Sequence, residues 1–432
     1  MTTTSRTPAW RRPSPPSSSP AWYRRSLAVV FLLLLAIALA NARAYPPGGG
    51  YDAVDHIEYA DLLRHGHVPS EVGASEYYSP PAFYGIAAGL TWIGEQAGLG
   101  EPHRVVLAFN VLVLAATAAF LLLLARELWP TRLVLHVAAL AYLAFLPVTI
   151  KLAAMFHPEP LDLLAVTAGL YLTARGLRRG RFSTREAIGL GVVLGLALLV
   201  RQFALYGVGA ALLALLAARH WRAAAIAAAA CALVAGPWYV RQAVTYSSPT
   251  GFGETSTQAQ KSILARRPAS FYVGTGLPDV LTAPWRPHYL NRAIPTTYSE
   301  LWGDYFGIWD WKGSAQTLTP RVETDLRVQS LVGLLPTALA VCGWLLLLWR
   351  RSWLVALVPL LGFLGYAYFT IAYPTRDGDV LKASYMLTTA TAWALCFGYA
   401  VDRIAASRRA AGIALAVVLA ATVAAELRFL VY

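Results

Sequence analysis

The chain alternates long runs of Leu, Ala and Val with short polar stretches along its whole length. Because the hydrocarbon core of a bilayer is about 30 Å thick, a helix needs roughly 20 apolar residues to cross it. Eleven stretches approach that length, at approximately 26–41, 104–125, 133–150, 158–175, 186–200, 203–218, 223–240, 329–349, 353–372, 385–401 and 411–427. The pattern therefore predicts an all-α membrane protein, a polytopic bundle of about 11 transmembrane helices.

Two of the polar stretches, 42–103 and 241–328, are too long to be simple turns, and we expect them to be extracytoplasmic loops. Within the first, the apolar stretch Ile86–Ile93 is too short to cross a bilayer and is expected on the membrane surface. Residues 1–25, rich in Ser, Thr and Pro, predict a disordered cytoplasmic arm ahead of one transmembrane domain, 26–432. The first span also resembles a signal peptide, but we expect it to be retained as the first anchor.

The positive charges follow this predicted topology. With 57% hydrophobic and 14% charged residues, the composition excludes an ordinary soluble domain. If the N-terminus is cytoplasmic, the inner segments carry 19 of the 36 Lys and Arg residues but only three of the 23 acids. This asymmetry follows the positive-inside rule. The net charge of +13 therefore indicates a multi-pass plasma-membrane protein and not a nucleic-acid-binding one.

The three cysteines, Cys231, Cys342 and Cys396, all lie within apolar spans. Their scattered positions give neither the spacing of a metal site nor a disulfide framework. Redox chemistry is therefore not expected.

The first candidate site follows the first span, in the segment Tyr51–Tyr59. If this segment is helical, four of its polar residues share one face: Asp52, Asp55, His56 and Tyr59. A carboxylate beside an imidazole at a membrane surface is a natural general base. The same spacing also fits a structural role, in which Asp52 caps a short interfacial helix.

Two further outer segments combine prolines with polar side chains. In the first, Pro80 and Pro81 fix the backbone, and aromatic neighbours such as Tyr78 can stack on a sugar or anchor the loop among lipid headgroups. In the second, His157 and Glu159 flank a proline at the start of a predicted helix, where an acid complements the positive helix end. The sequence leaves open whether this pair is structural or faces the same cavity as the first motif.

Polar residues also occur at the outer ends of two later spans. Arg201 and Gln202 end an apolar span, where the arginine can hold a phosphate in its planar fork or simply snorkel to the interface. Arg376 lies in another outer loop, which continues to Lys382 and Tyr385. These last two residues are one helical turn apart, so both can point at an anionic headgroup, unless the loop is only a solvated turn.

The long segment 241–328 contains an aromatic cluster, Tyr298–Trp309, that includes Trp302. Aromatic side chains at this density fit sugar stacking and packing at the membrane interface equally well. We see no internal repeat of the kind that marks inverted-repeat transporters.

The order of these motifs resembles the GT-C class of membrane glycosyltransferases, which take a sugar from a polyprenyl phosphate. Asp52 and His56 resemble the acidic-x-x-x-His pattern of the terminal glucosyltransferases of N-glycan assembly, and Pro80–Pro81 resembles their later Pro-Pro step. The segments Phe156–Glu159 and Lys382–Tyr385 also resemble parts of such enzymes. The specific likeness is confined to some 40 residues of the chain.

The chain departs from that pattern at Ala53, which stands where the family generally has a second acid. A different register is used by the protein O-mannosyltransferases and aminoarabinose transferases, and it aligns Asp55 and His56 instead. The two registers name different bases. We favour Asp52, because its distance to His56 and the downstream Pro-Pro both fit, and keep Asp55 as a candidate.

The resemblance implies an inverting transfer of a sugar from a polyprenyl-phosphate donor to a hydroxyl of a lipid, glycan or protein, outside the cytoplasm. The implied roles are Asp52 or Asp55 as the base, His56 and Glu159 as acceptor-orienting groups, and Arg201, Lys382 and either Arg376 or His157 as phosphate ligands. Carboxylates suit Mg²⁺ or Mn²⁺, so a divalent cation is compatible with the motifs, although no ligand set is spelled out. The expected partners are the lipid-linked donor, membrane lipids and the acceptor.

Two other classes remain as alternatives. A transporter or lipid flippase needs ionisable residues at mid-membrane depth or paired broken helices, whereas the polar groups here concentrate at the outer ends of the spans. An outward-facing glycan polymerase or ligase would rely on Arg and His in the long outer loop and would use a diphosphate-linked donor.

Overall fold

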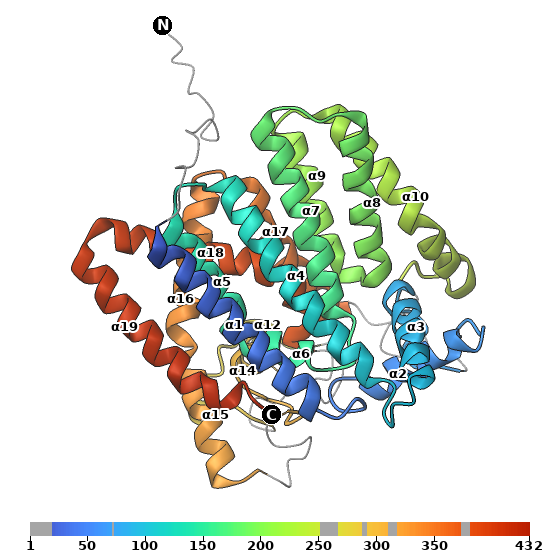
Figure 1. The fold of residues 1–432 in the computed structure, drawn as a ribbon, viewed down its shortest axis with the longest axis horizontal. Coiled ribbons are helices and arrows are strands. Elements are labelled where there is room, and N and C mark those ends of the chain that lie inside the picture. The colour runs from blue at the N-terminus through green and yellow to red at the C-terminus, as the bar shows by residue number, and fades with distance from the viewer. Residues whose placement is uncertain (1–19, 71–72, 251–266, 287–291, 310–317, 373–380) are drawn as a thin grey trace, which may run out of the picture.

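The computed structural model describes residues 20–70, 73–250, 267–286, 292–309, 318–372 and 381–432, and the described residues form helices, turns and loops without strands (Figure 1). The helices at the predicted spans are α1 (Ala21–Ala44), α4 (Arg104–Leu128), α5 (Leu133–Phe145), α6 (Pro147–Ala153), α7 (Glu159–Arg179), α8 (Thr184–Val200), α9 (Leu205–Ala217), α10 (Trp221–Tyr246), α16 (Leu334–Trp349), α17 (Trp353–Ala372), α18 (Ala390–Ser407) and α19 (Arg409–Glu426). The connecting elements are α2 (Ala53–Arg64), α3 (Ala82–Gln96), η1 (Gln202–Ala204), α12 (Ala269–Val273), α13 (Asp279–Thr282), α14 (Ala293–Trp302), α15 (Pro320–Val332), η3 (Ala383–Thr389) and η4 (Leu427–Phe429).

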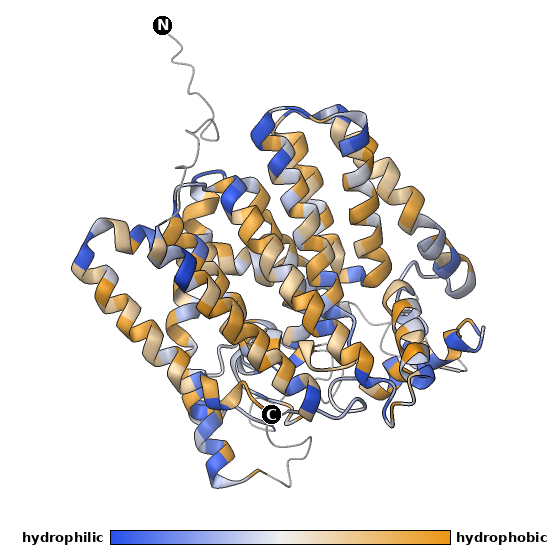
Figure 2. Cartoon of the chain, viewed as in Figure 1, coloured by the Kyte–Doolittle hydropathy of each residue, from blue (hydrophilic) through white to orange (hydrophobic). Residues whose placement is uncertain are grey.

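The predicted all-α, polytopic fold is confirmed. Among the described residues, six helical segments are long and apolar enough to cross a membrane, and the bent pair of α5 and α6 makes a seventh if the two helices form one span. Figure 2 shows apolar residues along the helices and polar residues gathered at their ends. The other helices at predicted spans are shorter or more polar, so the number of eleven crossings stays a prediction.

Small residues let several helices approach closely. On α8, a Cβ atom at Gly191 would lie 2.3 Å from the carbonyl oxygen of Ala227 on α10. On α16, a Cβ at Gly343 would lie 1.9 Å from the carbonyl oxygen of Cys396 on α18. Both distances are too short for any side chain, and close backbone approach of this kind is typical of helix packing in membranes.

The bend between α5 and α6 occurs at Pro147, the first residue of α6. Proline has no backbone N–H to continue the preceding helix, and the two helix axes meet at 58°. The bend brings α6 beside α14 and η3. There Lys151 is buried, donates a hydrogen bond to the carbonyl of Gly303 and lies 3.5 Å from Oδ1 of Asp304.

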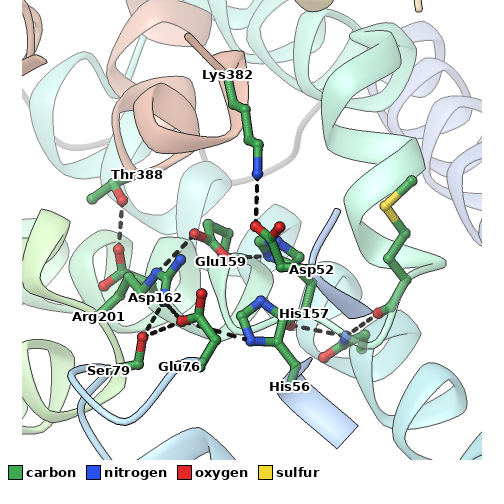
Figure 3. Close-up of polar contacts among 12 residues, drawn as sticks. Asp52, His56, Glu76, Ser79, His157, Glu159, Asp162, Arg201, Lys382 and Thr388 are labelled. Carbon is green, nitrogen blue, oxygen red and sulfur yellow. Dashed lines mark hydrogen bonds and ion pairs between the residues drawn. The ribbon is translucent and has the colours of Figure 1, made fainter. Parts of the chain in front are cut away.

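The segments that carry the candidate site meet at one end of the bundle. The start of α2, the loop before α3, the start of α7, the end of α8 and the segment leading into η3 all lie there (Figures 1 and 3). The stretch Ile86–Ile93 lies in α3, with Ile86, Trp92 and Ile93 exposed; its place on a membrane surface stays a prediction. Of the predicted arm 1–25, residues 1–19 lie outside the described residues, and α1 begins at Ala21.

Candidate active site

Asp52 lies directly before α2 in a left-handed backbone conformation, with φ 50° and ψ 18°. Although it occupies the N-cap position, its side chain forms no cap hydrogen bond. Instead, its Oδ2 accepts a hydrogen bond of 2.7 Å from Nζ of Lys382, which precedes η3. Nζ also lies 5.6 Å from the ring centre of Tyr51. The Asp52 side chain is 33% exposed and that of Lys382 only 10%, so a ligand can reach this pair from the aspartate side.

The pair is charged at neutral pH. Burial alone would raise the pKa of Asp52, but the charges of Lys382 and His56 and the hydrogen bond from Lys382 hold it below its usual range. Burial would lower the pKa of Lys382, but Tyr385 and Asp52 together raise it. Asp52 is therefore an ionised carboxylate whose basicity is reduced by its partner.

Asp55 has different surroundings. Burial and the negative charges of Asp52 and Glu76 raise its pKa, against a hydrogen bond with Ser75. No ion pair among the described residues involves Asp55. The structure therefore brings Asp52, and not Asp55, into contact with a cation.

Arg201 is the centre of a buried network behind this pair (Figure 3). It follows α8 and is 4% exposed. Its Nε donates to Oε1 of Glu159 at 2.9 Å, and its Nη1 donates to Oε2 of Glu76 at 3.1 Å and to Oγ of Ser79 at 2.6 Å. The hydroxyls of Ser79 and Tyr78 donate to the two oxygens of Glu76. The guanidinium thus holds two carboxylates together.

Glu76 was not predicted as a site residue, although it precedes the Pro80–Pro81 step by four positions. It is 4% exposed. Burial alone would raise its pKa, but His56, Arg201 and the two hydroxyls outweigh burial and lower the pKa to about 2. The only sequence signal was an acid within an otherwise aromatic segment, and its partner lies 125 positions away.

His56 is fully buried on α2 and faces the network (Figure 3). Burial lowers the pKa of His56 to about 4, so the ring is neutral at pH 7. Its Nδ1 lies 2.9 Å from the hydroxyl of Tyr84, while its Nε2 has no hydrogen-bond partner. The ring also packs edge-on against His157, with ring centres 4.8 Å apart. Nδ1 of His157 lies in close contact with Oε2 of Glu159.

Tyrosines support the network on the α2–α3 side. Tyr59 stacks on Tyr84 with ring centres 3.9 Å apart, and its hydroxyl donates to the carbonyl of Ser79. Pro81 is the N-cap of α3, so the Pro-Pro step sets where α3 begins. The predicted aromatic and proline residues therefore position the loop that carries Glu76.

The element η3 joins the cluster from the other side. Thr388 donates a hydrogen bond of 2.5 Å to Oδ2 of Asp162, a fully buried acid on α7. Tyr385 packs its ring against Phe203 and Phe369. These contacts fix the segment that carries Lys382.

Two predicted residues do not join this cluster. Gln202 begins η1 beside Arg201 but forms none of the hydrogen bonds described above. Trp302 packs against Gly333, and its Nε1 donates to Thr337, so it supports the contact between α14 and α16. Arg376 lies outside the described residues.

A cavity of about 390 Å³ opens beside η3. Its walls come from α5, α14, α16, α17, η3 and α18 and are almost entirely apolar, with Ala340, Phe363, Ala383 and Trp393 among the lining residues. Ala383, which lines the cavity, is the residue that follows Lys382 in the chain.

The described residues include no group of three or more His, Cys, Asp or Glu side chains placed to hold a metal ion. The carboxylates of Asp52, Glu76 and Glu159 instead face Lys382 or Arg201. As arranged here, these carboxylates do not form a ligand set for a divalent cation.

Residues 79–238 match the family model described as dolichyl-phosphate-mannose-protein mannosyltransferase. The matched stretch includes Pro80, His157, Glu159 and Arg201 but not Asp52. The oligosaccharyltransferase of Archaeoglobus fulgidus, solved tethered to an acceptor peptide, superposes with a TM-score of 0.55 at 13% identity, over 95% of this chain and 54% of that one. The chain has the GT-C fold.

The same oligosaccharyltransferase in complex with Zn and sulfate gives a TM-score of 0.54 at 14% identity, over 94% of this chain and 53% of the other. The chain thus spans about half the length of that oligosaccharyltransferase. A weaker likeness, with a TM-score of 0.39 at 14% identity, is to ArnT of Cupriavidus metallidurans bound to undecaprenyl phosphate, over 90% of this chain and 79% of that one. No curated protein sequence matches the chain.

Proposed function

We propose that this GT-C protein is an inverting glycosyltransferase that moves a sugar from a polyprenyl-phosphate donor to a hydroxyl acceptor at the extracytoplasmic face of the plasma membrane. The observation that carries the proposal is the contact between Asp52 and Lys382, together with an apolar cavity lined by Ala383, the residue that follows Lys382. In this proposal Asp52 accepts the proton, Lys382 binds the phosphate and the cavity holds the start of the lipid chain.

Lys382 is assigned to the donor phosphate. An ammonium group in a water-poor cleft stabilises the charge that builds on a departing phosphate. The first isoprenyl units enter the cavity of about 390 Å³, which begins at Ala383. Polyprenyl phosphate as the donor is also supported by the family model, which is named for a dolichyl-phosphate-mannose enzyme.

Asp52 is assigned as the base. The acceptor hydroxyl attacks the anomeric carbon, the bond from that carbon to the phosphate oxygen breaks, and the hydroxyl proton passes to the Asp52 carboxylate. The products are the glycoside, with inverted anomeric configuration, and polyprenyl phosphate. Asp55 is the alternative base, and the two are separated by the experiment below.

His56 and Glu159 are assigned to orient the acceptor. Nε2 of His56 lacks a hydrogen-bond partner but is buried, so it can bond an acceptor hydroxyl only where that hydroxyl reaches the buried network. Arg201 acts through Glu76 and Glu159, because the network already occupies its Nε and Nη1. His157 contacts Glu159, and we assign it to help position either the donor phosphate or the acceptor.

No step of the proposed transfer is assigned to a divalent cation, because the carboxylates described above face Arg201 or Lys382. The oligosaccharyltransferase of Archaeoglobus fulgidus has been solved in complex with Zn, so a metal requirement is worth testing directly. Donor consumption with and without chelator tests this requirement.

The test uses the full chain in liposomes with labelled polyprenyl-phosphate mannose and a membrane extract as the source of acceptors. The readout is loss of label from the polyprenyl phosphate, with the product traced by mass. Asp52→Asn is expected to lower the rate by 10²–10⁴. Asp61→Asn, on the same helix and partly exposed, is the matched control and should stay within about threefold.

Loss in Asp55→Asn with retention in Asp52→Asn would transfer the role of base to Asp55. If Asp52→Asn and Asp55→Asn both kept the wild-type rate, neither aspartate would be the base and the proposed mechanism would be wrong. Consumption of a diphosphate-linked donor alone would favour a polymerase or ligase, and lipid translocation without any new glycoside would favour a flippase.

A further inference from the structure

A second cleft lies at the other end of the bundle from the candidate active site. It has a volume of about 540 Å³ and is formed by the turn between α7 and α8 and the turn between α9 and α10. Figure 1 shows both turns at the top of the view, and Figure 2 shows polar residues gathered there. Its lining residues include Phe182, Ser183, Arg219, His220, Trp221 and Arg222. The charge distribution assigns this end to the cytoplasm.

The cleft has uncompensated positive charge. Arg219 and Arg222 both line it, and no carboxylate among the described residues forms an ion pair with either of them. The nearest acid on the α8 side, Glu186, is already bound by Arg179 at 2.9 Å and by the backbone and hydroxyl of Ser183. The positive charge is therefore available for an external anion.

Arg219 occupies a backbone position that favours glycine. Its φ is +63°, in the left-handed region, and its N–H bonds to the carbonyl of Leu216 at the end of α9. The neighbouring turn after α7 has Gly180 at the equivalent position, with φ +68°. Glycine would adopt this conformation without steric cost, so an arginine here is not explained by the backbone alone.

One wall of the cleft is apolar. Phe182 packs edge-on against His220 with ring centres 5.3 Å apart, and Ile226 continues the apolar wall along α10. Trp221, at the start of α10, is 62% exposed, as expected of a tryptophan at a membrane interface. A small soluble anion would gain nothing from these apolar side chains, whereas the glycerol and acyl chain of a lipid could pack against them.

We propose that this cleft binds the headgroup of an anionic phospholipid. The phosphate lies between Arg219 and Arg222, and the glycerol and upper acyl chain lie against Phe182 and Trp221. Basic pockets at the cytoplasmic ends of membrane helices commonly bind anionic headgroups. This site is independent of the proposed glycosyl transfer.

The test measures how much phosphatidylglycerol stays bound to the full chain after extraction from mixed phosphatidylglycerol and phosphatidylcholine nanodiscs, by native mass spectrometry. The variant is Arg219→Gly with Arg222→Gln, in which glycine keeps the left-handed turn. The matched control is Arg181→Gln with Arg185→Gln, which removes the same charge from the same end but does not line the cleft.

Phosphatidylglycerol affinity is expected to fall about 30-fold in the cleft variant, because two charged contacts with the phosphate are lost, and at most twofold in the control, whose arginines make no such contact. Equal losses in the two variants would show only diffuse charge attraction and overturn the proposal. Displacement of the lipid by millimolar inorganic phosphate would show a site for soluble anions and overturn it as well. Unchanged thermal stability of the cleft variant shows that the loss is not due to unfolding.

Discussion

Nζ of Lys382 lies 2.7 Å from Oδ2 of Asp52, although the two residues are 330 positions apart in the chain. In the proposed reaction the lysine binds phosphate and the aspartate takes a proton. The two roles conflict while the residues are paired, because the cation makes the carboxylate a weaker base. Donor phosphate attracts the lysine and so releases the aspartate, which would make the base effective only after the donor has bound.

Replacing Lys382 tests this dependence. Lys382→Met should raise the pKa of Asp52, because burial is then no longer opposed by the cation, and the acid limb of kcat/KM should move to higher pH. Donor KM should rise roughly 10- to 100-fold, as for loss of a charged hydrogen bond. Lys382→Arg, which keeps the charge, should leave the acid limb in place. A pH profile unchanged in Lys382→Met would contradict the pairing.

Removing Arg201 should destabilise the protein more than removing any surface arginine. Arg201→Leu leaves Glu76 and Glu159 buried without their cation, which costs about 3–5 kcal/mol of unfolding free energy. Arg201→Lys should recover only part of this loss, because one ammonium cannot reproduce the fork of the guanidinium. The measurement is the unfolding temperature in detergent.

The control for that series is Arg178→Leu. Arg178 pairs with Glu127 at 3.0 Å, but its side chain is 34% exposed. Exposed pairs contribute about 0–1 kcal/mol, so the unfolding temperature should hardly change. If Arg178→Leu and Arg201→Leu lowered the unfolding temperature equally, the buried network around Arg201 would not explain the loss of stability.

His56 should make stability depend on pH. Its folded pKa of about 4 lies below the unfolded value of 6.5, so the unfolded chain binds a proton that the folded protein does not. The stability is complete above pH 6.5 and is lost as the pH falls toward 4, by on the order of 3 kcal/mol. His56→Gln should give a shallower decline of unfolding temperature between pH 6.5 and pH 4. His65→Gln, an exposed position after the same helix, should keep the wild-type slope.

Filling the apolar cavity should impair use of long-chain donors. Ala340→Phe places a ring in the cavity from α16 and should raise KM for a long polyprenyl-phosphate donor roughly tenfold. A short-chain donor should be affected less, since its tail does not extend as far. Ala338→Phe, on an exposed face of the same helix, is the control. An equal rise in KM for the long-chain and short-chain donors would show that the cavity does not hold the polyprenyl chain.

Much of the architecture follows from the sequence, because apolar span length and charge asymmetry are local properties. The helices at most of the predicted spans could be placed in this way, but the predicted span 133–150 is broken at Pro147 into α5 and α6, which span length alone did not predict. The presence of His157 and Glu159 near Asp52 was one of two open alternatives, and the structure brings these residues into one cluster.

The pairings could not be predicted, because they join residues far apart in the chain. In the sequence Glu76 is one acid in an aromatic loop, and only the fold places Arg201 beside it. From the sequence, Arg201 could bind a phosphate. In the structure, two of its N–H groups already donate hydrogen bonds to the carboxylates of Glu159 and Glu76. No spacing rule links positions 125 or 330 residues apart.

The left-handed backbone at Asp52 restricts which residues evolution can use there. Among the residues that adopt φ near +50° most readily, which are glycine, asparagine, aspartate and histidine, only aspartate carries a carboxylate. Glutamate carries the same charge but resists this conformation and extends its carboxylate by one methylene. Chains that preserve this turn and this chemistry should therefore show an invariant aspartate, without the exchange for glutamate that ordinary acidic positions allow.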